Sequence, residues 1–146
     1  MSIAGKPETL IILVVAAALV DRDGQVLVQQ RPAGKQHGGL WEFPGGKVER
    51  GETPEAALVR ELREELQIGV SPVAVRPLSF TTEEAAGRHL TLLLYIVEAW
   101  TGELSPTAAD AIRWVSSESL RDLPMPPADL PLVDVLARAL LDQQSG

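Results

Sequence analysis

Long apolar runs near the N-terminus predict two strands joined by a turn. Residues 9–20 read TLIILVVAAALV, and the polar stretch DRDG at 21–24 separates them from QVLVQQ at 25–30. Two β-rich runs around an Asp-Gly pair are typical of a β-hairpin. The first run also follows a lysine and ends in alanines, as a secretory signal does. Cleavage there would delete a central strand, so we favour a strand, and the run is too short to span a membrane.

Apolar periodicity returns after residue 70 and predicts the remaining elements. We expect strands at 73–81, 90–100 and 112–115, with a turn at 83–87, and a short helix ending at Leu120 that Ser116 or Ser117 caps. A closing helix at 132–141 is expected to face the core with Leu132, Val135, Leu136, Ala139 and Leu140.

The central stretch 46–68, GKVERGETPEAALVRELREELQI, predicts an amphipathic helix at 54–66. The Thr53 hydroxyl can accept from a free N–H of the first turn, and Pro54 suits the first helical position because its missing N–H costs nothing there. Apolar residues recur at steps of three and four and form one stripe, which consists of Leu58, Val59, Leu62 and Leu66. This stripe would pack on a core.

Three carboxylates flank that stripe. At about 100° per residue, Glu61, Glu64 and Glu65 fall within an arc of roughly 100°. Arg60 can pair with Glu64 at spacing i,i+4 but neutralises only part of the charge. All-oxygen ligands suit Mg²⁺ or Mn²⁺. A solvated acidic face is the alternative for such a run taken alone.

The residues before this helix are rich in glycine. WEFPGG at 41–46 ends in two glycines, which let the backbone approach a metal or a phosphate closely, so that a carbonyl there could be a ligand.

The two histidines of the chain, His37 and His89, have no second histidine at ligand spacing, and we expect both to be structural or solvent-facing.

Composition narrows the class of protein. The length of 146 residues predicts a single domain over 1–146, and the absence of cysteine fits a cytoplasmic location. A net charge of −7 argues against nucleic acid polymers as partners, because binding them needs clustered Lys and Arg. It would also repel a polyphosphate substrate unless a divalent metal intervened. The oligomeric state is left open.

The central stretch resembles the signature of the Nudix hydrolases nearly position for position. The matching residues are Gly46, Glu52, Arg60, Glu61, Leu62, Glu64, Glu65 and Ile68. The similarity to the MutT branch runs from about residue 11 to 141, through LWEFPGGKVERGETPEAALVREL, GRHLTLLLYIVEAWTGE and MPPADLPLVDVL. The resemblance implies an α+β fold, an α/β/α sandwich with a mixed β-sheet between helices.

The same resemblance implies a reaction and a set of site residues. The reaction would be magnesium-dependent hydrolysis of a nucleoside triphosphate, a small-molecule substrate, to the monophosphate and pyrophosphate. Catalytic roles would fall to Glu61, Glu64 and Glu65, and these three with the Gly45 carbonyl would hold the metal. Residues matching the nucleotide pocket are Arg31, Arg88 and Asp129.

Two positions depart from the family pattern. Gln67 stands where the family has a helix-ending glycine, and we expect the helix to run on to Gly69 as its cap. Ala108 stands where family members commonly carry a Glu, six residues before Trp114. The general base must therefore be Glu61, Glu64 or Glu65, or Asp110 must reach the site.

The base preference depends on Asp129. An ionised Asp only accepts hydrogen bonds, so it would favour a base edge that presents N–H groups, from guanine or cytosine, although Asp is also a good helix N-cap. We expect hydrolysis of a damaged purine nucleotide such as 8-oxo-dGTP. CTP or a modified dCTP is the alternative substrate. A nucleotide-binding sensor without turnover is the alternative of another class.

Overall fold

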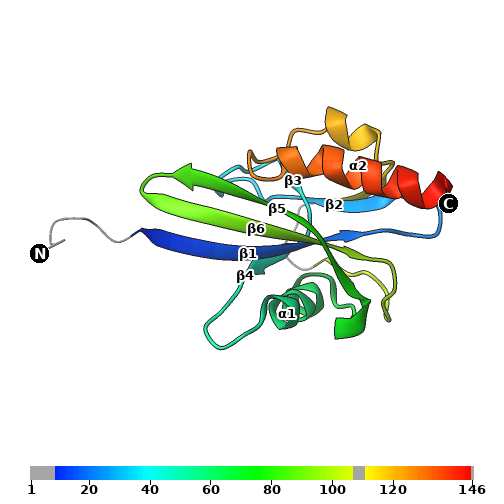
Figure 1. Ribbon diagram of the computed structural model, residues 1–146, viewed down its shortest axis with the longest axis horizontal. Coiled ribbons are helices and arrows are strands. Elements are labelled where there is room, and N and C mark those ends of the chain that lie inside the picture. Colours follow the sequence, from blue (N-terminus) through cyan, green and yellow to red (C-terminus); the bar gives the residue numbers. More distant parts are fainter. Residues whose placement is uncertain (1–8, 107–110, 146) are drawn as a thin grey trace, which may run out of the picture.

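Two β-sheets lie between two helices in the computed structural model, which describes residues 9–106 and 111–145. Helix α1 (Pro54–Leu66) covers one side and helix α2 (Leu130–Ser145) the other (Figure 1). The expected α/β/α sandwich is therefore confirmed. Within the described residues, no helix is both long enough and apolar enough to cross a membrane.

The larger sheet has four strands in the order β4-β1-β6-β5. Strands β1 (Leu10–Leu19) and β6 (Arg88–Val97) are parallel along their whole length. Strand β5 (Val75–Ala85) pairs antiparallel with β6, and β4 (Gly45–Lys47) pairs antiparallel with β1. The sheet is therefore mixed, as the sequence led us to expect.

The smaller sheet has three antiparallel strands in the order β3-β2-β7, which are β2 (Val26–Gln30), β3 (Trp41–Glu42) and β7 (Ile112–Val115). The predicted hairpin between 9–20 and 25–30 is wrong. The turn forms, but β1 and β2 share only the isolated bridge Val20↔Val26 and then enter different sheets. One edge of β1 is occupied by β6 along its whole length, and β4 pairs with Val14, Val15 and Ala16 on the other.

Each face of the larger sheet has its own apolar core. On one face, the stripe of α1 packs against alternate residues of β1, and the buried members include Val15, Ala17, Leu19, Leu58, Leu62 and Leu66. On the other, α2 packs with Leu132, Val133, Leu136 and Leu140 buried. Val135, predicted to face the core, is 38% exposed, because the buried face of α2 is turned toward Val133 and Ala137.

The minor elements follow the sequence with shifted boundaries. The β5–β6 turn is shorter than the predicted 83–87, since β5 continues to Ala85 and only two residues separate it from β6. Short 3₁₀ helices form at Pro72–Ala74 (η1) and Ser119–Asp122 (η2). The Ser116 hydroxyl accepts from the N–H of Ser119 at 3.2 Å, but the N-cap residue of η2 is Glu118 and has no side-chain cap, so the expected cap at Ser116 or Ser117 is wrong.

The C-terminus of α1 differs from the prediction. The helix stops at Leu66, and Gln67 itself adopts the left-handed conformation, with φ 59° and ψ 31°. Its N–H donates to the carbonyl of Arg63 at 3.0 Å. Gly69 instead pairs with Thr101 through reciprocal backbone hydrogen bonds of 2.9 Å, which prevent it from continuing the helix. The expected cap at Gly69 is therefore wrong.

Replacing Gln67 by Gly should stabilise the protein by about 1 kcal/mol, because glycine adopts left-handed φ without the steric cost that a Cβ imposes. The side chain of Gln67 contributes little to offset this, since its amide lies 3.4 Å from the Ser105 hydroxyl and is exposed. Urea denaturation of both proteins measures the difference. An unchanged or lowered midpoint would show that the Gln67 conformation carries no strain.

Candidate active site

Helix α1 presents its carboxylates beside β4. The helix is fixed by its buried stripe and by the Thr53 hydroxyl, which accepts from the N–H of Ala56 at 3.1 Å, as predicted. The N–H of Gly45 donates to Glu65 at 3.1 Å. A Cβ on Gly46 would lie 2.3 Å from the carboxyl carbon of Glu61, so this glycine leaves the space that the carboxylate fills. The missing Cβ of Gly46 thus allows the helix to approach the strand.

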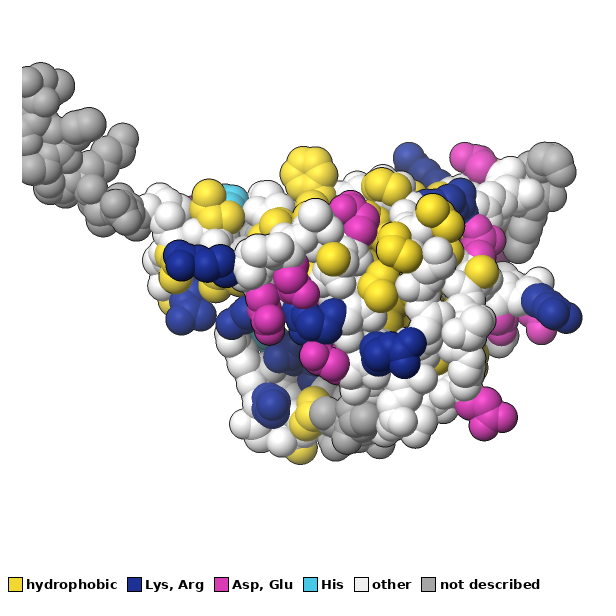
Figure 2. All heavy atoms as spheres, turned by 90° about the horizontal axis from the view of Figure 1, so that it is seen from below, with side chains coloured by type: hydrophobic (Ala, Val, Ile, Leu, Met, Phe, Trp, Pro, Cys, Tyr) yellow, Lys and Arg dark blue, Asp and Glu magenta, His cyan; other side chains and the backbone are white. Residues whose placement is uncertain are grey.

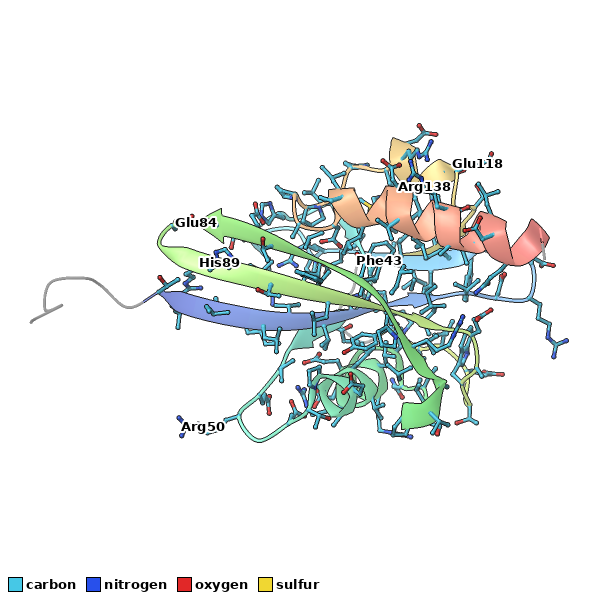
Figure 3. The ribbon with its side chains drawn as sticks, viewed as in Figure 1. Phe43, Arg50, Glu84, His89, Glu118 and Arg138 are labelled. Carbon is cyan, nitrogen blue, oxygen red and sulfur yellow. The ribbon has the colours of Figure 1, made fainter. Side chains whose placement is uncertain are left out.

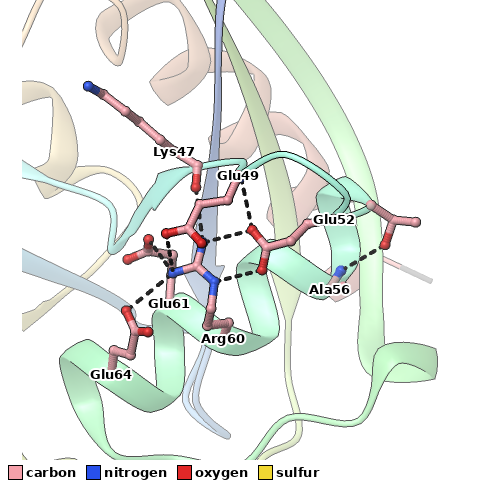
Figure 4. Close-up of polar contacts among 8 residues, drawn as sticks. Lys47, Glu49, Glu52, Ala56, Arg60, Glu61 and Glu64 are labelled. Atoms are coloured by element: carbon pink, nitrogen blue, oxygen red, sulfur yellow. Dashed lines mark hydrogen bonds and ion pairs between the residues drawn. The ribbon is translucent and has the colours of Figure 1, made fainter.

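Arg60 binds most of the acidic groups on this side (Figure 4). Its Nε and Nη2 form a bidentate pair with Glu52 at 2.6 and 2.9 Å. Its Nη1 contacts Glu61 at 2.9 Å and Glu64 at 3.2 Å, the latter being the predicted i,i+4 pair. Its Nη2 also donates to the Lys47 carbonyl at 3.1 Å. Arg60 therefore fixes both carboxylates and the loop before the helix.

The ion pair between Glu52 and Arg60 was not predicted from the sequence. The hydrogen bond that Glu52 accepts from Arg60, together with one from the N–H of Glu49, lowers its pKa to about 2. A spacing of eight residues lies outside the i,i+3 and i,i+4 pairs of a helix, so no local rule could find this contact. Glu52 stays ionised at every ordinary pH and positions Arg60.

Glu65 has the opposite electrostatic environment. Burial and the charge of Glu61 raise the pKa of Glu65 to about 8, against the hydrogen bonds that it accepts from Gln29 and Gly45. Burial likewise raises the pKa of Glu61, against the hydrogen bond from Arg60. Two neighbouring carboxyl groups that resist ionisation are stabilised as anions by a cation placed between them. Their chemistry therefore suits a hard divalent ion.

The arrangement of these carboxylates is not that of a closed metal site. In the part of the chain that the structure describes, no three Asp, Glu or His side chains are gathered closely enough to hold an ion. Glu61 and Glu64 are turned toward Arg60. To share an ion with Glu65 they would have to turn away from the guanidinium.

A cavity of about 910 Å³ begins at Glu65 and brings together residues from distant parts of the sequence. Gly45 and Glu65 line it, as do all three residues expected in a nucleotide pocket, Arg31, Arg88 and Asp129. The volume is that of a small-molecule site. Ala108 and Asp110, on which the choice of general base partly depends, lie outside the described residues.

Asp129 is 7% exposed and lies in the wall of this cavity. Its backbone carbonyl accepts from the N–H of Leu132 at 3.0 Å, at the start of α2. Its carboxyl group instead accepts from the N–H of Phe43, which lies between α2 and the larger sheet (Figure 3). Burial and the charge of Glu42 raise the pKa of Asp129 to about 7. The side chain is thus positioned by the cavity wall rather than by the helix N-terminus.

Arg31 is held by Glu42, which the sequence did not single out. Arg31 Nη1 lies 2.7 Å from Glu42 Oε2. Burial raises the pKa of Glu42, against the hydrogen bond from Arg31. Glu42 pairs in register with Gln29 across β2 and β3, and both line the cavity. In the sequence, Glu42 could have been recognised only by its position between two aromatic residues, Trp41 and Phe43, which are both buried in the fold.

The pKa of Asp129 predicts a pH dependence of stability. The folded chain holds this proton to about pH 7, whereas an unfolded Asp releases it near 3.8. The stabilisation is therefore complete below about pH 4 and is lost as the pH rises through about 7. Asp129→Asn should remove this loss and stabilise the protein at pH 8 by about 2–4 kcal/mol.

Urea denaturation at pH 5 and pH 8, without divalent metal, measures this effect. Glu65 contributes a loss of the same sign, so the variant keeps part of the slope. Asp134→Asn is the control, because Asp134 is exposed and pairs with Arg121 on the surface. Equal pH dependence in Asp129→Asn and the parent would contradict the prediction.

Comparison with known proteins finds one family over most of the chain. The NUDIX domain matches residues 11–136. A CTP pyrophosphohydrolase of Escherichia coli is 42% identical over 120 residues, which cover 82% of this chain and 87% of that protein. An 8-oxo-dGTP diphosphatase of the same organism is 35% identical over 127 residues, or 86% and 97% of the two chains. The solution structure of the E. coli ORF135 protein superposes with a TM-score of 0.82 at 39% identity, over 95% of this chain and 98% of that one.

Proposed function

Since this chain belongs to the NUDIX domain family, we propose that it hydrolyses a nucleoside triphosphate to the monophosphate and pyrophosphate and so removes damaged nucleotides such as 8-oxo-dGTP. The observation that carries the proposal is that one cavity contains Glu65 of the acidic helix and also Arg31, Arg88 and Asp129. A nucleotide needs both kinds of contact, carboxylates through a metal at its phosphates and polar groups at its base.

The metal would be Mg²⁺ or Mn²⁺, held by Glu61, Glu64, Glu65 and the carbonyl of Gly45. Hydrolases of this family generally need a divalent metal. Such an ion supplies positive charge for the phosphates and Lewis acidity at the reacting phosphorus. Binding it would release the proton that Glu65 holds up to about pH 8. The three carboxylates would hold the ion, and one of them would accept the proton of the attacking water.

Arg60 and Glu52 would act as positioning residues. Because Arg60 contacts both Glu61 and Glu64, it neutralises part of the repulsion between them while the site is free of metal. The bidentate pair with Glu52 would keep the guanidinium in place if those two carboxylates held an ion. Glu52 thereby supports the metal site without touching the metal.

The nucleoside half would lie against Asp129, with Arg31 and Arg88 at the base or the phosphates. Asp129 is buried, so its ionised carboxylate would favour a base edge that donates N–H groups, which would replace lost water contacts. Guanine, 8-oxoguanine and cytosine all offer such donors. CTP or a modified dCTP is the second candidate, which the similarity to a CTP pyrophosphohydrolase favours.

The charges and composition of the chain support our proposals for its partner and its compartment. On the face over α1, acidic and basic side chains of the described residues lie interspersed and form no continuous basic track for a nucleic acid polymer (Figure 2). We therefore propose a small nucleotide as the partner and residues 1–146 as a single domain. We also propose a cytoplasmic location, which the absence of cysteine supports.

The test is pyrophosphate release with Mg²⁺ across ordinary and oxidised triphosphates, with Glu64→Gln as the blank. Turnover led by 8-oxo-dGTP would support the proposed substrate, and turnover led by CTP or a modified dCTP would support the second candidate. Asp129→Ala should change the ranking among nucleotides more than it changes kcat on any one of them. Binding without turnover of any triphosphate would refute the proposal and restore the sensor hypothesis.

A further inference from the structure

The loop between β2 and β3 forms one wall of the cavity, through Pro32, Lys35, Gln36 and His37. Backbone hydrogen bonds close its two ends, from Arg31 N–H to the Leu40 carbonyl at 2.8 Å and from Gly39 N–H to the Arg31 carbonyl at 3.0 Å. The Arg31 side chain reaches into it and donates to the Gln36 carbonyl at 2.9 Å. These contacts fix the backbone that carries the wall residues.

His37 has an unfavourable backbone conformation in this wall, with φ 59°. The loop has glycine at its other left-handed positions, Gly34 at φ 90° and Gly39 at φ 84°. Glycine at 37 would likewise avoid the steric cost of a Cβ at positive φ. The side chain does not offset that cost in the fold, because it is exposed and donates or accepts no hydrogen bond among the described residues. A conformation that the fold does not require is a reason to look for a function.

The position of His37 indicates which part of the cavity it serves. It follows Gln36, whose backbone carbonyl accepts from the Arg31 side chain at 2.9 Å. Glu42 binds Arg31, and its charge in turn acts on Asp129. His37 therefore belongs to the same side of the cavity as Asp129, where the proposed function puts the nucleoside rather than the phosphates.

We propose that His37 contacts the nucleoside half of the substrate, with its imidazole ring against the face of the base. This inference rests on the proposed function. An aromatic ring on a loop whose ends are hydrogen-bonded can stack on a purine or pyrimidine without reading its edge, which Asp129 is left to do. His37 lines the cavity from this left-handed position, so we attribute the local strain to substrate binding and not to stability.

Kinetics on the leading triphosphate, together with thermal unfolding, test the proposal. His37→Gly should raise KM about 5- to 30-fold with kcat nearly unchanged, because stacking binds the ground state and the transition state alike. It should also raise Tm by about 2–4 °C, since the steric cost is gone. His37→Asn, which tolerates left-handed φ, should raise KM without raising Tm. His37→Tyr, which keeps an aromatic face, should restore most of the affinity.

Gln67→Gly is the matched control, because Gln67 has the same φ of 59° but does not line the cavity. It should raise Tm and leave KM unchanged. If His37→Gly and His37→Asn keep the KM of the parent, the imidazole has no part in binding and the inference is wrong, while turnover by the parent leaves the proposed function standing. Absence of turnover and of nucleotide binding in the parent would instead refute the proposed function.

Discussion

Glu65→Gln should lower kcat/KM about a thousandfold, equivalent to about 4 kcal/mol of transition-state stabilisation, while leaving the protein folded. The amide keeps an oxygen that can accept from the N–H of Gly45, now 3.1 Å from the carboxylate, so the contact between α1 and β4 survives. It cannot provide the anionic ligand that a divalent ion requires. Steady-state pyrophosphate release with Mg²⁺ measures the loss.

Stability distinguishes this functional role from a structural one. Burial raises the pKa of Glu65 to about 8, so the neutral amide should be at least as stable as the parent without metal at pH 8. The parent should gain stability when Mg²⁺ is added, and the variant should not. Glu118→Gln, with the same change of charge on the far side of the molecule (Figure 3), is the control and should behave as the parent. A variant that keeps its activity would exclude Glu65 from the metal site.

Gly45→Ala and Gly46→Ala should have different effects although the residues are adjacent. A Cβ on Gly45 would lie 1.9 Å from the Val15 carbonyl oxygen and 2.7 Å from the Ala16 Cα, which are backbone atoms of β1. These atoms cannot move without breaking the β1–β4 pairing. We expect Gly45→Ala to lose about 2–4 kcal/mol of stability or to fail to fold.

A Cβ on Gly46 would instead lie 2.3–2.6 Å from the carboxylate of Glu61, the mobile end of a side chain. Displacing this carboxylate breaks its 2.9 Å contact with Arg60 and moves a proposed metal ligand. Gly46→Ala should therefore remain folded, lose about 1 kcal/mol of stability, and lower kcat/KM about a hundredfold. Urea denaturation and the same pyrophosphate assay separate the two effects.

Gly69→Ala is the control for these two glycines. Its added Cβ would displace the side-chain ends of Thr101 and Arg63, at 2.7 and 2.9 Å, neither of which lines the cavity. It should stay folded and keep its activity. Equal activity in Gly46→Ala and Gly69→Ala would mean that the position of Glu61 does not matter for the reaction.

The local sequence pattern predicted where helices and strands form, but not which strands pair with each other. The capping threonine, the proline and the apolar stripe predicted the start of α1 at Pro54 and its buried face, because a helix closes its hydrogen bonds within one segment. The hairpin prediction failed, because a strand pairs with whichever edge is free. One edge of β1 pairs with β6, which begins 78 residues after β1, and the middle of the other edge pairs with β4.

The end of α1 shows the same limit on a single residue. The sequence located the conflict at Gln67, where a glycine was expected, but favoured an extension to Gly69. The hydrogen bonds of Gly69 with Thr101 come from a segment more than thirty residues away, and they stop the helix at Leu66. Gln67 adopts the strained conformation because that pairing determines the path of the chain beyond it.

The sequence by itself determined the family, the acidic helix and the candidate residues, because each depends on residue types at fixed spacing along one segment. Only the tertiary structure decided that Arg31, Arg88 and Asp129 share a cavity with Glu65, that Glu52 positions Arg60, and that His37 lines the wall beside them. Burial decided the proton affinities of Glu65 and Asp129 as well. These properties arise from segments brought together by β1, β2 and β6, and the sequence within any one segment does not encode which neighbours it will meet.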